Sequence, residues 1–195
     1  MLSLITPPTV EPLAWDDVKV RLRLDNQNER AQIESLLIPS ARKWVENYTK
    51  RRLITATYEL AMRRWPSDGV IRLPLSPLQS VTDIKYMDMA GALQTLAASV
   101  YVVETPTEQT EEAGQITLAY GQVWPQALPQ ENSIKVTFVV GYGAAGSNVP
   151  QQLLDAMLKR IAESFENREE QIAGMSVRSA VTAEQLADDY RVLTL

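Results

Sequence analysis

The chain has 195 residues, 45% of them hydrophobic, and a net charge of −5, which suits one medium domain with a substantial core. It contains no histidine and no cysteine, which excludes disulfides and argues against zinc binding and against Ser-His-Asp or Cys-His catalysis within the chain. The acidic balance disfavours a general nucleic-acid binder, because such proteins carry a basic surface.

The N-terminal segment MLSLITPPTVEPLAW lacks the basic start and the long apolar run of a signal peptide, so we expect none. No segment approaches the ~20 apolar residues that a membrane span requires, and we expect a soluble protein without a membrane partner. The D-x-D-x-D-G pattern of calcium-binding loops is missing as well. We therefore expect no metal and no cofactor.

Two helices are predicted near the N-terminus. The first covers residues 14–24, where Asp16 and Asp17 in the first turn complement the positive end of the helix dipole. The second covers residues 29–48, where apolar side chains recur with a period of about 3.6 residues. Pro39 lies inside this helix and removes one backbone hydrogen bond, so we expect a kink in a continuous helix.

Apolar and polar residues begin to alternate after residue 52, as in half-buried strands. Pro, Gly, Asp and Ser separate the apolar segments at short intervals, which indicates an antiparallel meander rather than an alternation of strands and helices. The expected strands cover residues 53–65, 70–74, 81–88, 92–96, 100–104, 115–120 and 133–140.

A long helix is predicted after Pro150, which suits a first helical turn because its missing N–H would be unpaired there. A short helix is expected within residues 182–195, with Thr182 as its N-cap. The predicted core of the helical part consists of Leu36, Trp44, Leu154, Met157, Ile161 and Phe165.

These elements predict an α+β fold, in which a small helical bundle (two N-terminal helices plus one long C-terminal helix) carries an inserted antiparallel β meander. Residues 1–52 form the N-terminal helical part, 53–147 the β-rich insertion, and 148–195 the C-terminal helix and arm. The arm ends in an apolar tip that would favour aggregation if exposed. It is expected either to fold back on its own subunit or to bind a partner protein through Tyr190, Arg191, Val192, Leu193 and Leu195.

Gly141, Gly143 and Gly146 have the G-x-G-x-x-G spacing of dinucleotide-binding loops. In those loops the helix begins among the glycines, so that free N–H groups face the phosphates. Here residues 147–149 intervene, and Pro150 supplies no N–H. A second parallel strand ending in Asp or Glu about twenty residues later is also missing. We therefore interpret the motif as a turn from a strand into a helix.

Three further patterns admit a functional and a structural interpretation. The basic run at residues 50–52 could contact phosphate, but a solvated helix C-terminus is favoured, because cations offset the dipole there. A cluster of carboxylates could bind a cation but is more typical of a solvated helix face: Glu163, Glu166, Glu169 and Glu170. Given the acidic balance, core or interface positions are favoured over base stacking for Trp44, Trp65 and Trp124.

Five segments, taken together, are similar to a known family: DDVKVRLRLD, IPSARKWVENYTKRRLITATYEL, IRLPLSPLQSVTDIKYMDMAGALQTL, GQVWP and VTFVVGYG…VPQQLLDAMLKRIAESFENRE. In order and spacing, over residues 14–170, they resemble the head-to-tail connector (adaptor) proteins of tailed bacteriophages, in the branch with a β-rich insertion. Lys50 stands where the family often has Gly, and Pro39 interrupts a helix that is usually continuous. Residues after 170 match poorly.

The resemblance implies a structural virion protein that is not an enzyme. Such proteins form a homo-oligomeric ring, expected to be dodecameric, beneath the portal protein. The ring extends the DNA channel, through which genomic DNA passes without sequence-specific binding, and it provides a docking platform for the next neck or tail protein. An acidic wall suits this channel because carboxylates repel phosphates. The implied location is the virion neck, after synthesis in the host cytoplasm.

Two other functions stay open from the residues alone. One is a monomeric binding module or chaperone that acts during virion morphogenesis. The other is an enzyme on an α+β scaffold, which the absence of histidine, cysteine and a matched pair of carboxylates disfavours.

Overall fold

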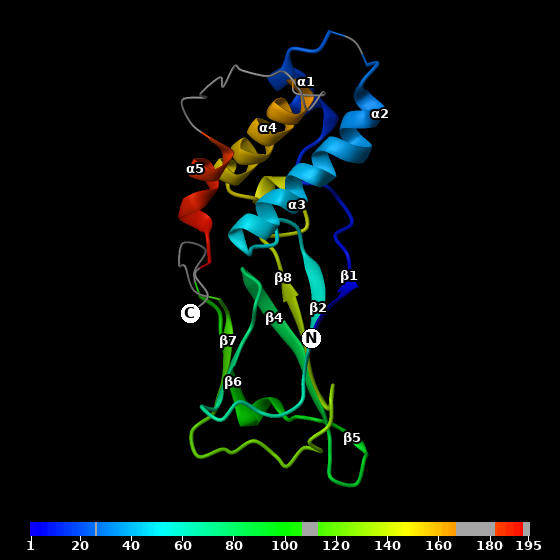
Figure 1. Ribbon diagram of the computed structural model, residues 1–195. Coiled ribbons are helices and arrows are strands. Elements are labelled where there is room, and N and C mark those ends of the chain that lie inside the picture. Colours follow the sequence, from blue (N-terminus) through cyan, green and yellow to red (C-terminus); the bar gives the residue numbers. More distant parts are fainter. Residues whose placement is uncertain (26, 107–112, 167–181, 193–195) are drawn as a thin grey trace, which may run out of the picture.

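Helices occupy one end of an elongated molecule and strands the other, in a computed structural model that describes residues 1–25, 27–106, 113–166 and 182–192 (Figure 1). Helices from the N-terminal and C-terminal parts of the chain lie together at the helical end. The strands between them in sequence extend away from the helices. The α+β class predicted from the sequence is therefore confirmed, while the division of the chain at residues 52 and 147 stays a prediction.

The first helix, α1, spans Trp15–Leu22, close to its predicted position. Asp17 in its first turn accepts a hydrogen bond of 2.8 Å from the N–H of Ala14, which fixes the entry of the chain into the helix. The helix ends at Arg23 in the left-handed conformation, with φ of 54°. Trp15 and Val18 are buried, as the helical periodicity predicts.

The second predicted helix is one continuous helical run with a π-helical turn inside it. It consists of α2 (Arg30–Gln32), the π turn η1 (Ile33–Leu37) and α3 (Ile38–Thr49). Pro39 cannot donate to the carbonyl of Ser35, and its ring crowds that turn. The helix runs through Pro39 as expected, and the disturbance takes the form of the π turn, in which the N–H of Ile38 donates to the carbonyl of Ile33.

The π turn also changes which side chains face the core. Ile33 and Ile38, five positions apart, are both buried, because a π turn holds one more residue than an α turn. Leu36 is instead 53% exposed, so its prediction as a core residue is wrong. The sequence period of 3.6 residues placed Leu36 inward only on the assumption of an undisturbed α-helix.

Helix α4 (Gln151–Glu166) begins directly after Pro150, as predicted, and supplies the opposite wall of the helical core. Met157 and Ile161 are buried in it, while three other predicted residues pack on it partly buried: Trp44, Leu154 and Phe165. Helix α5 (Ala183–Ala187) and the short 3₁₀ helix η4 (Asp188–Tyr190) follow. Thr182 caps α5 as predicted, since its hydroxyl accepts from the N–H of Gln185 at 3.2 Å.

The described part of the chain contains eight strands, which form two antiparallel sheets. The five-stranded sheet has the order β1-β2-β8-β4-β5, and the three-stranded sheet the order β3-β7-β6. Their bounds are β1 Leu2–Thr6, β2 Ala56–Met62, β3 Val70–Arg72, β4 Leu78–Met87, β5 Leu93–Thr95, β6 Tyr101–Glu104, β7 Gln115–Leu118 and β8 Ile134–Val140. A short 3₁₀ helix, η2 (Ala98–Val100), precedes β6.

The strand order differs from the predicted meander. Strand β8, the last along the chain, lies between β2 and β4 and pairs with both. Alternation in the sequence indicates which residues of a strand are buried, but it does not say which strand lies beside it. The buried residues of β8 pack in a core between the two sheets together with residues of β3 and β7.

Strand β1 was not predicted. Its residues, LSLIT, show no clear alternation, and only Ser3 is partly buried. The strand is held by antiparallel pairing with β2, in which Leu2 is opposite Leu60 and Ser3 is opposite Glu59. Its position depends on backbone hydrogen bonds, which sequence patterns do not reveal.

The glycine motif forms the turn from β8 through the 3₁₀ helix η3 (Gly146–Asn148) into α4, which confirms its interpretation as a turn. Gly141 has φ of 121°, and a Cβ there would lie 2.6 Å from the backbone of Ile54. A Cβ at Gly146 would collide with the carbonyl of Pro12. The glycines thus allow three backbone segments to lie close together where helices meet strands.

We predict that Met157→Ala lowers the free energy of unfolding by about 2–5 kcal/mol, because it leaves a cavity in the fully buried helical core. Leu36→Ala, the matched control, should change it by less than about 0.5 kcal/mol, since that side chain is half exposed. Denaturant melts of both variants measure these values. Equal losses would show that the buried face of the helix is assigned wrongly.

Candidate interaction site

The residues that the structure describes contain no group of three or more His, Cys, Asp or Glu side chains placed to hold a metal ion. Within the same residues, no helix is long and apolar enough to cross a membrane. Of the predicted carboxylate cluster, Glu163 lies 3.5 Å from Arg160 and Glu166 is exposed. Glu169 and Glu170 lie outside the described residues.

The basic run at residues 50–52 is only partly the solvated helix end that was predicted. Lys50 is exposed and ends α3 in the left-handed conformation, with φ of 60°. This reversal turns the chain inward, so that Arg51 is 1% exposed and Arg52 is partly buried. The prediction is wrong for the two arginines because the turn at Lys50 places them between helices and strands.

Arg51 connects three parts of the chain. Its Nε donates to the carbonyl of Tyr190 at 2.6 Å, and its guanidinium lies 5.9 Å from the centre of the Tyr190 ring. Its Nη1 donates to Ser76 Oγ at 3.5 Å, in the loop before β4. Arg51 therefore holds the end of α3, the start of β4 and the C-terminal arm together.

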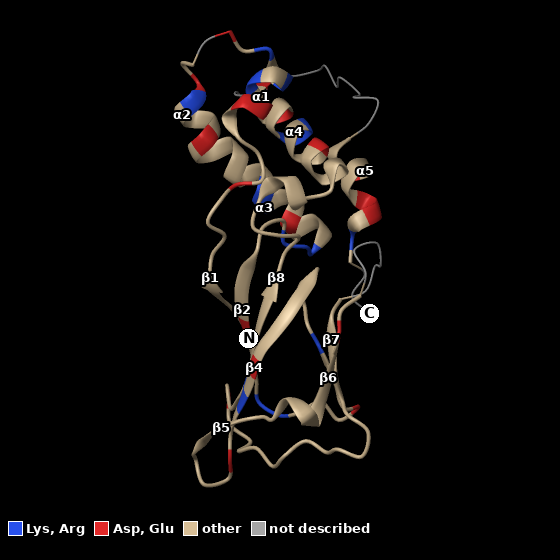
Figure 2. Cartoon of the chain, turned by 180° about the vertical axis from the view of Figure 1, so that it is seen from behind, with Lys and Arg blue, Asp and Glu red and all other residues tan. Residues whose placement is uncertain are grey.

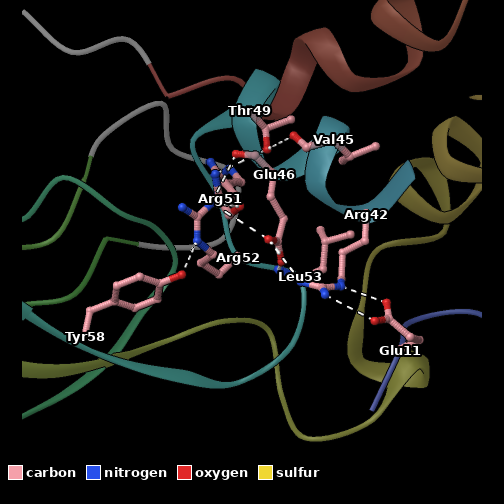
Figure 3. Close-up of polar contacts among 9 residues, drawn as sticks. All are labelled: Glu11, Arg42, Val45, Glu46, Thr49, Arg51, Arg52, Leu53 and Tyr58. Atoms are coloured by element: carbon pink, nitrogen blue, oxygen red, sulfur yellow. Dashed lines mark hydrogen bonds and ion pairs between the residues drawn. The ribbon is translucent and has the colours of Figure 1, made fainter. Parts of the chain in front are cut away.

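Glu46, 6% exposed, is the centre of a second polar cluster beside Arg51 (Figure 3). Its Oε1 accepts from the N–H of Leu53 at 3.0 Å, and its Oε2 lies 3.4 Å from Arg42 and 3.9 Å from Arg52. Arg52 also donates to the Tyr58 hydroxyl of β2 at 2.8 Å. The cluster therefore joins α3 to the first strand of the insertion.

Burial raises the pKa of the Glu46 carboxyl above its ordinary value of 4.5, against the opposing effects of the Leu53 N–H and of the two arginines. Arg42 gives its shorter contacts, 2.7 and 3.1 Å, to both oxygens of Glu11. Glu46 is left with the longer contact to Arg42, so the cost of burial outweighs the attraction.

The C-terminal arm, as far as the structure describes it, packs on its own chain. The N–H of Val192 donates to the carbonyl of Thr49 at 2.9 Å, and the Val192 side chain is 4% exposed. Tyr190 packs on the helical core, partly buried. Arg191 is exposed, with its guanidinium 5.5 Å from the ring centre of Tyr48. Leu193 and Leu195, the other predicted contact residues, lie outside the described residues.

Two polar contacts fasten the short helix of the arm to the bundle. The Tyr48 hydroxyl donates to Asp188 at 2.9 Å, and the side-chain amide of Gln152 donates to Asp189 at 3.2 Å. The Asp188 contact raises the pKa of the Tyr48 hydroxyl. These contacts involve α3 and α4, so the arm packs against both helices.

The strand end of the molecule carries a surface with few charges. Residues 119–130 contain no charged side chain, and this loop is tan along its course (Figure 2). The N–H of Leu128 donates to the carbonyl of Met87 at 2.9 Å, which holds the loop beside the end of β4. The indole ring of Trp124, in this loop, stacks on that of Trp65 with the ring centres 4.6 Å apart. Both side chains pack on the core beside the strands, so their predicted core role is confirmed. Large exposed apolar side chains at this end are Met89, Leu93, Tyr120 and Val123.

The turn between β4 and β5 presents part of this surface rigidly. Asp88 Oδ1 accepts from the N–H groups of Ala90 and Ala92, both at 2.9 Å, and Oδ2 accepts from the Gln94 amide at 2.8 Å. These bonds, the Gln94 bond most of all, lower the pKa of Asp88. Met89 is held outward with 59% exposure. The expected strands 81–88 and 92–96 place a turn here, which is confirmed, and Asp followed by Gly three positions later is typical of such turns. The bonds that Asp88 accepts were not predicted.

The chain has an α+β fold with helices at one end and strands at the other (Figure 1). No protein-family model and no curated protein matches the chain. Solved structures do. A chain of the "Neck of empty GTA particle computed with C6 symmetry" is 24% identical, with a TM-score of 0.81 over 100% of this chain and 97% of that one.

Two related structures give the same result. A chain of the "Virion of native gene transfer agent (GTA) particle" is 24% identical with a TM-score of 0.79. The match covers 100% of this chain and 97% of that one. A chain of the "Neck of native GTA particle computed with C12 symmetry" is 22% identical with a TM-score of 0.72, at the same coverage. The protein therefore shares its complete fold with chains of these particles.

We predict that Arg51→Gln lowers the free energy of unfolding by about 1.5–3 kcal/mol, because it removes charged hydrogen bonds from a buried junction. It should also speed hydrogen exchange at the Val192 amide, as the arm loosens. Lys50→Gln, at the exposed neighbouring position, is the matched control and should change neither quantity. Unchanged exchange at Val192 in Arg51→Gln would mean that Arg51 does not hold the arm.

A second prediction concerns pH. Because the pKa of Glu46 is raised in the folded state, the stability that this group contributes is complete below pH 4.5 and is lost as pH rises through the raised value. The stability of the wild type relative to Glu46→Gln should therefore fall as pH rises above 4.5. Urea melts across this range measure the difference, with Glu34→Gln on the exposed side as a charge control. A relative stability that rises with pH would contradict the assignment.

Proposed function

We propose that the protein is a structural component of the virion neck, a head-to-tail connector that forms a ring under the portal and extends the DNA channel. One observation carries the proposal: its fold matches, over the complete chain, a chain of a GTA particle neck with a TM-score of 0.81. The order of sequence segments, which resembles phage connectors, supports the same function independently.

The surfaces of the molecule fit a role in assembly. The elongated shape gives two well-separated ends, a helical end rich in charge and a strand end with an uncharged loop (Figure 2). A subunit that must contact one neighbour at each end needs such an asymmetric shape. We assign the strand end to contact with another neck protein, because exposed apolar side chains on a rigid turn lose little entropy on binding.

The ring is expected to contain twelve copies. The neck particles that hold similar chains were computed with C6 and with C12 symmetry, and a ring of twelve identical copies satisfies both. The net charge of −5 suits a channel wall past which DNA must slide, because carboxylates do not hold phosphates. No sequence-specific contact with DNA is proposed.

The C-terminal arm is proposed as a contact to the portal or to the neighbouring subunit. Tyr190 and Val192 anchor the arm to the bundle, which fixes the direction in which the chain continues. Arg191, Leu193 and Leu195 would then provide the contact itself. The anchoring reduces the entropy that the arm loses when it binds.

The proposal predicts that purified protein binds to DNA-filled, portal-bearing heads made without its gene and forms a ring of twelve copies, visible in averaged images of the neck. The double variant Leu193→Ser, Leu195→Ser should fold normally but bind these heads more weakly. Val20→Ser, which also removes an exposed apolar side chain, serves as its control. A single copy per neck, or protein that acts on heads and is absent from finished particles, would favour the chaperone function instead.

A further inference from the structure

The first strand leaves one edge of the five-stranded sheet open. Among the described residues β1 pairs with β2 alone, so its other side presents free N–H and C=O groups. Its exposed apolar side chains are Leu2, Leu4 and Ile5, and residues 2–6 contain no charge. Monomeric proteins protect such edges with lysine, proline or bulges. Here a register shift lies between Leu4 and Thr6, and Pro7 and Pro8 follow the strand, but residues 2–6 themselves contain neither lysine nor proline.

A second open edge belongs to the three-stranded sheet. Within the described part of the chain β6 pairs with β7 alone. Val102 is 50% exposed on this strand, and the sole charge is Glu104 at its end. The other two edge strands are β5 and β3. Strand β5 lies on the same side of the molecule as β1 in both views (Figures 1 and 2), and β3 ends in the exposed Arg72. The β1 and β6 edges carry exposed apolar side chains and no pair of like charges.

The two edges lie on opposite sides of the molecule. Figures 1 and 2, seen from front and back, both place β1 on one side and β6 with β7 on the other. A ring requires a heterologous contact, in which one surface of a subunit meets a different surface of the next. Two complementary surfaces on opposite sides meet that requirement, whereas a single self-complementary patch would give a closed dimer.

The chemistry that completes β1 is another apolar strand edge. Strand β6 provides one in every copy, with its sole charge, Glu104, at its end.

We propose that β1 of one copy lies along β6 of the next and that this pairing is the lateral contact of the ring. The inference rests on the proposed ring function and identifies the surfaces that would build it. Backbone hydrogen bonds across the seam would supply alignment, and Leu4 and Val102 would supply apolar contact. The contact joins the two different sheets of neighbouring subunits.

Cross-linking tests the pairing directly, because the chain has no cysteine of its own. The double variant Leu4→Cys, Val102→Cys is assembled on portal-bearing heads and treated with a short bis-maleimide, which tolerates a small shift in register. We expect a ladder of cross-linked species that extends to the complete ring. Each single variant should give none, and neither should the control pair Val20→Cys, Val102→Cys, whose first residue is 79% exposed on α1.

The outcomes separate this inference from the proposed function. Rings that form without the ladder would overturn the strand pairing and leave the connector function standing. Dimers from Leu4→Cys alone would show a self-complementary contact at β1 and would also overturn it. If no ring forms on heads, both fail. As a second measurement, Leu4→Lys should prevent ring assembly without a change in the melting temperature of the free protein, while Val20→Lys, at an exposed position on α1, should assemble normally.

Discussion

A buried carboxylate with two arginines around it determines how the two ends of this molecule fit together. An ionised group with 6% exposure must be partnered, because desolvation otherwise costs several kcal/mol. Glu46 finds partners within its own helix and at the first residues after the helix, and one of these, Arg52, donates in turn to Tyr58 in strand β2. Its position thus couples the end of α3 to the beginning of the sheet. Arg51, one residue away from Arg52, couples the same point to the C-terminal arm.

Much of the secondary structure could be predicted from the sequence, because it depends on local chemistry. The carboxylates in the first turn of α1, the Thr182 cap and Pro150 just before α4 each act on neighbouring backbone groups. The glycine turn was also identified correctly, since a nucleotide loop has further requirements that the sequence does not meet. Leu36 shows the limit of this reasoning. One extra residue in a π turn was enough to move it from the core to the surface.

The candidate site could not be predicted in the same way, because it is made by residues far apart in the chain. Arg51 and Tyr190 are brought together only once both parts of the helical bundle have packed. The sequence gives one signal at Arg51 and Arg52, which is the residue type itself. Arginine is favoured over lysine where a cation is buried or makes bidentate contacts. The i, i+4 spacing of Arg42 and Glu46 permits a contact on one helix face, but it does not show that this face is buried.

The direction of the strands has a mechanical consequence. In the five-stranded sheet the long strands β2, β4 and β8 run along the length of the molecule, from the helical end toward the far loops (Figure 1). Interstrand hydrogen bonds in antiparallel sheets lie across the strands. A pull or push between the two ends therefore loads these bonds in shear, all at the same time, whereas a sideways force would open them one after another. The subunit is stiffest along its long axis, and force applied at one end passes to the other with little deformation between them.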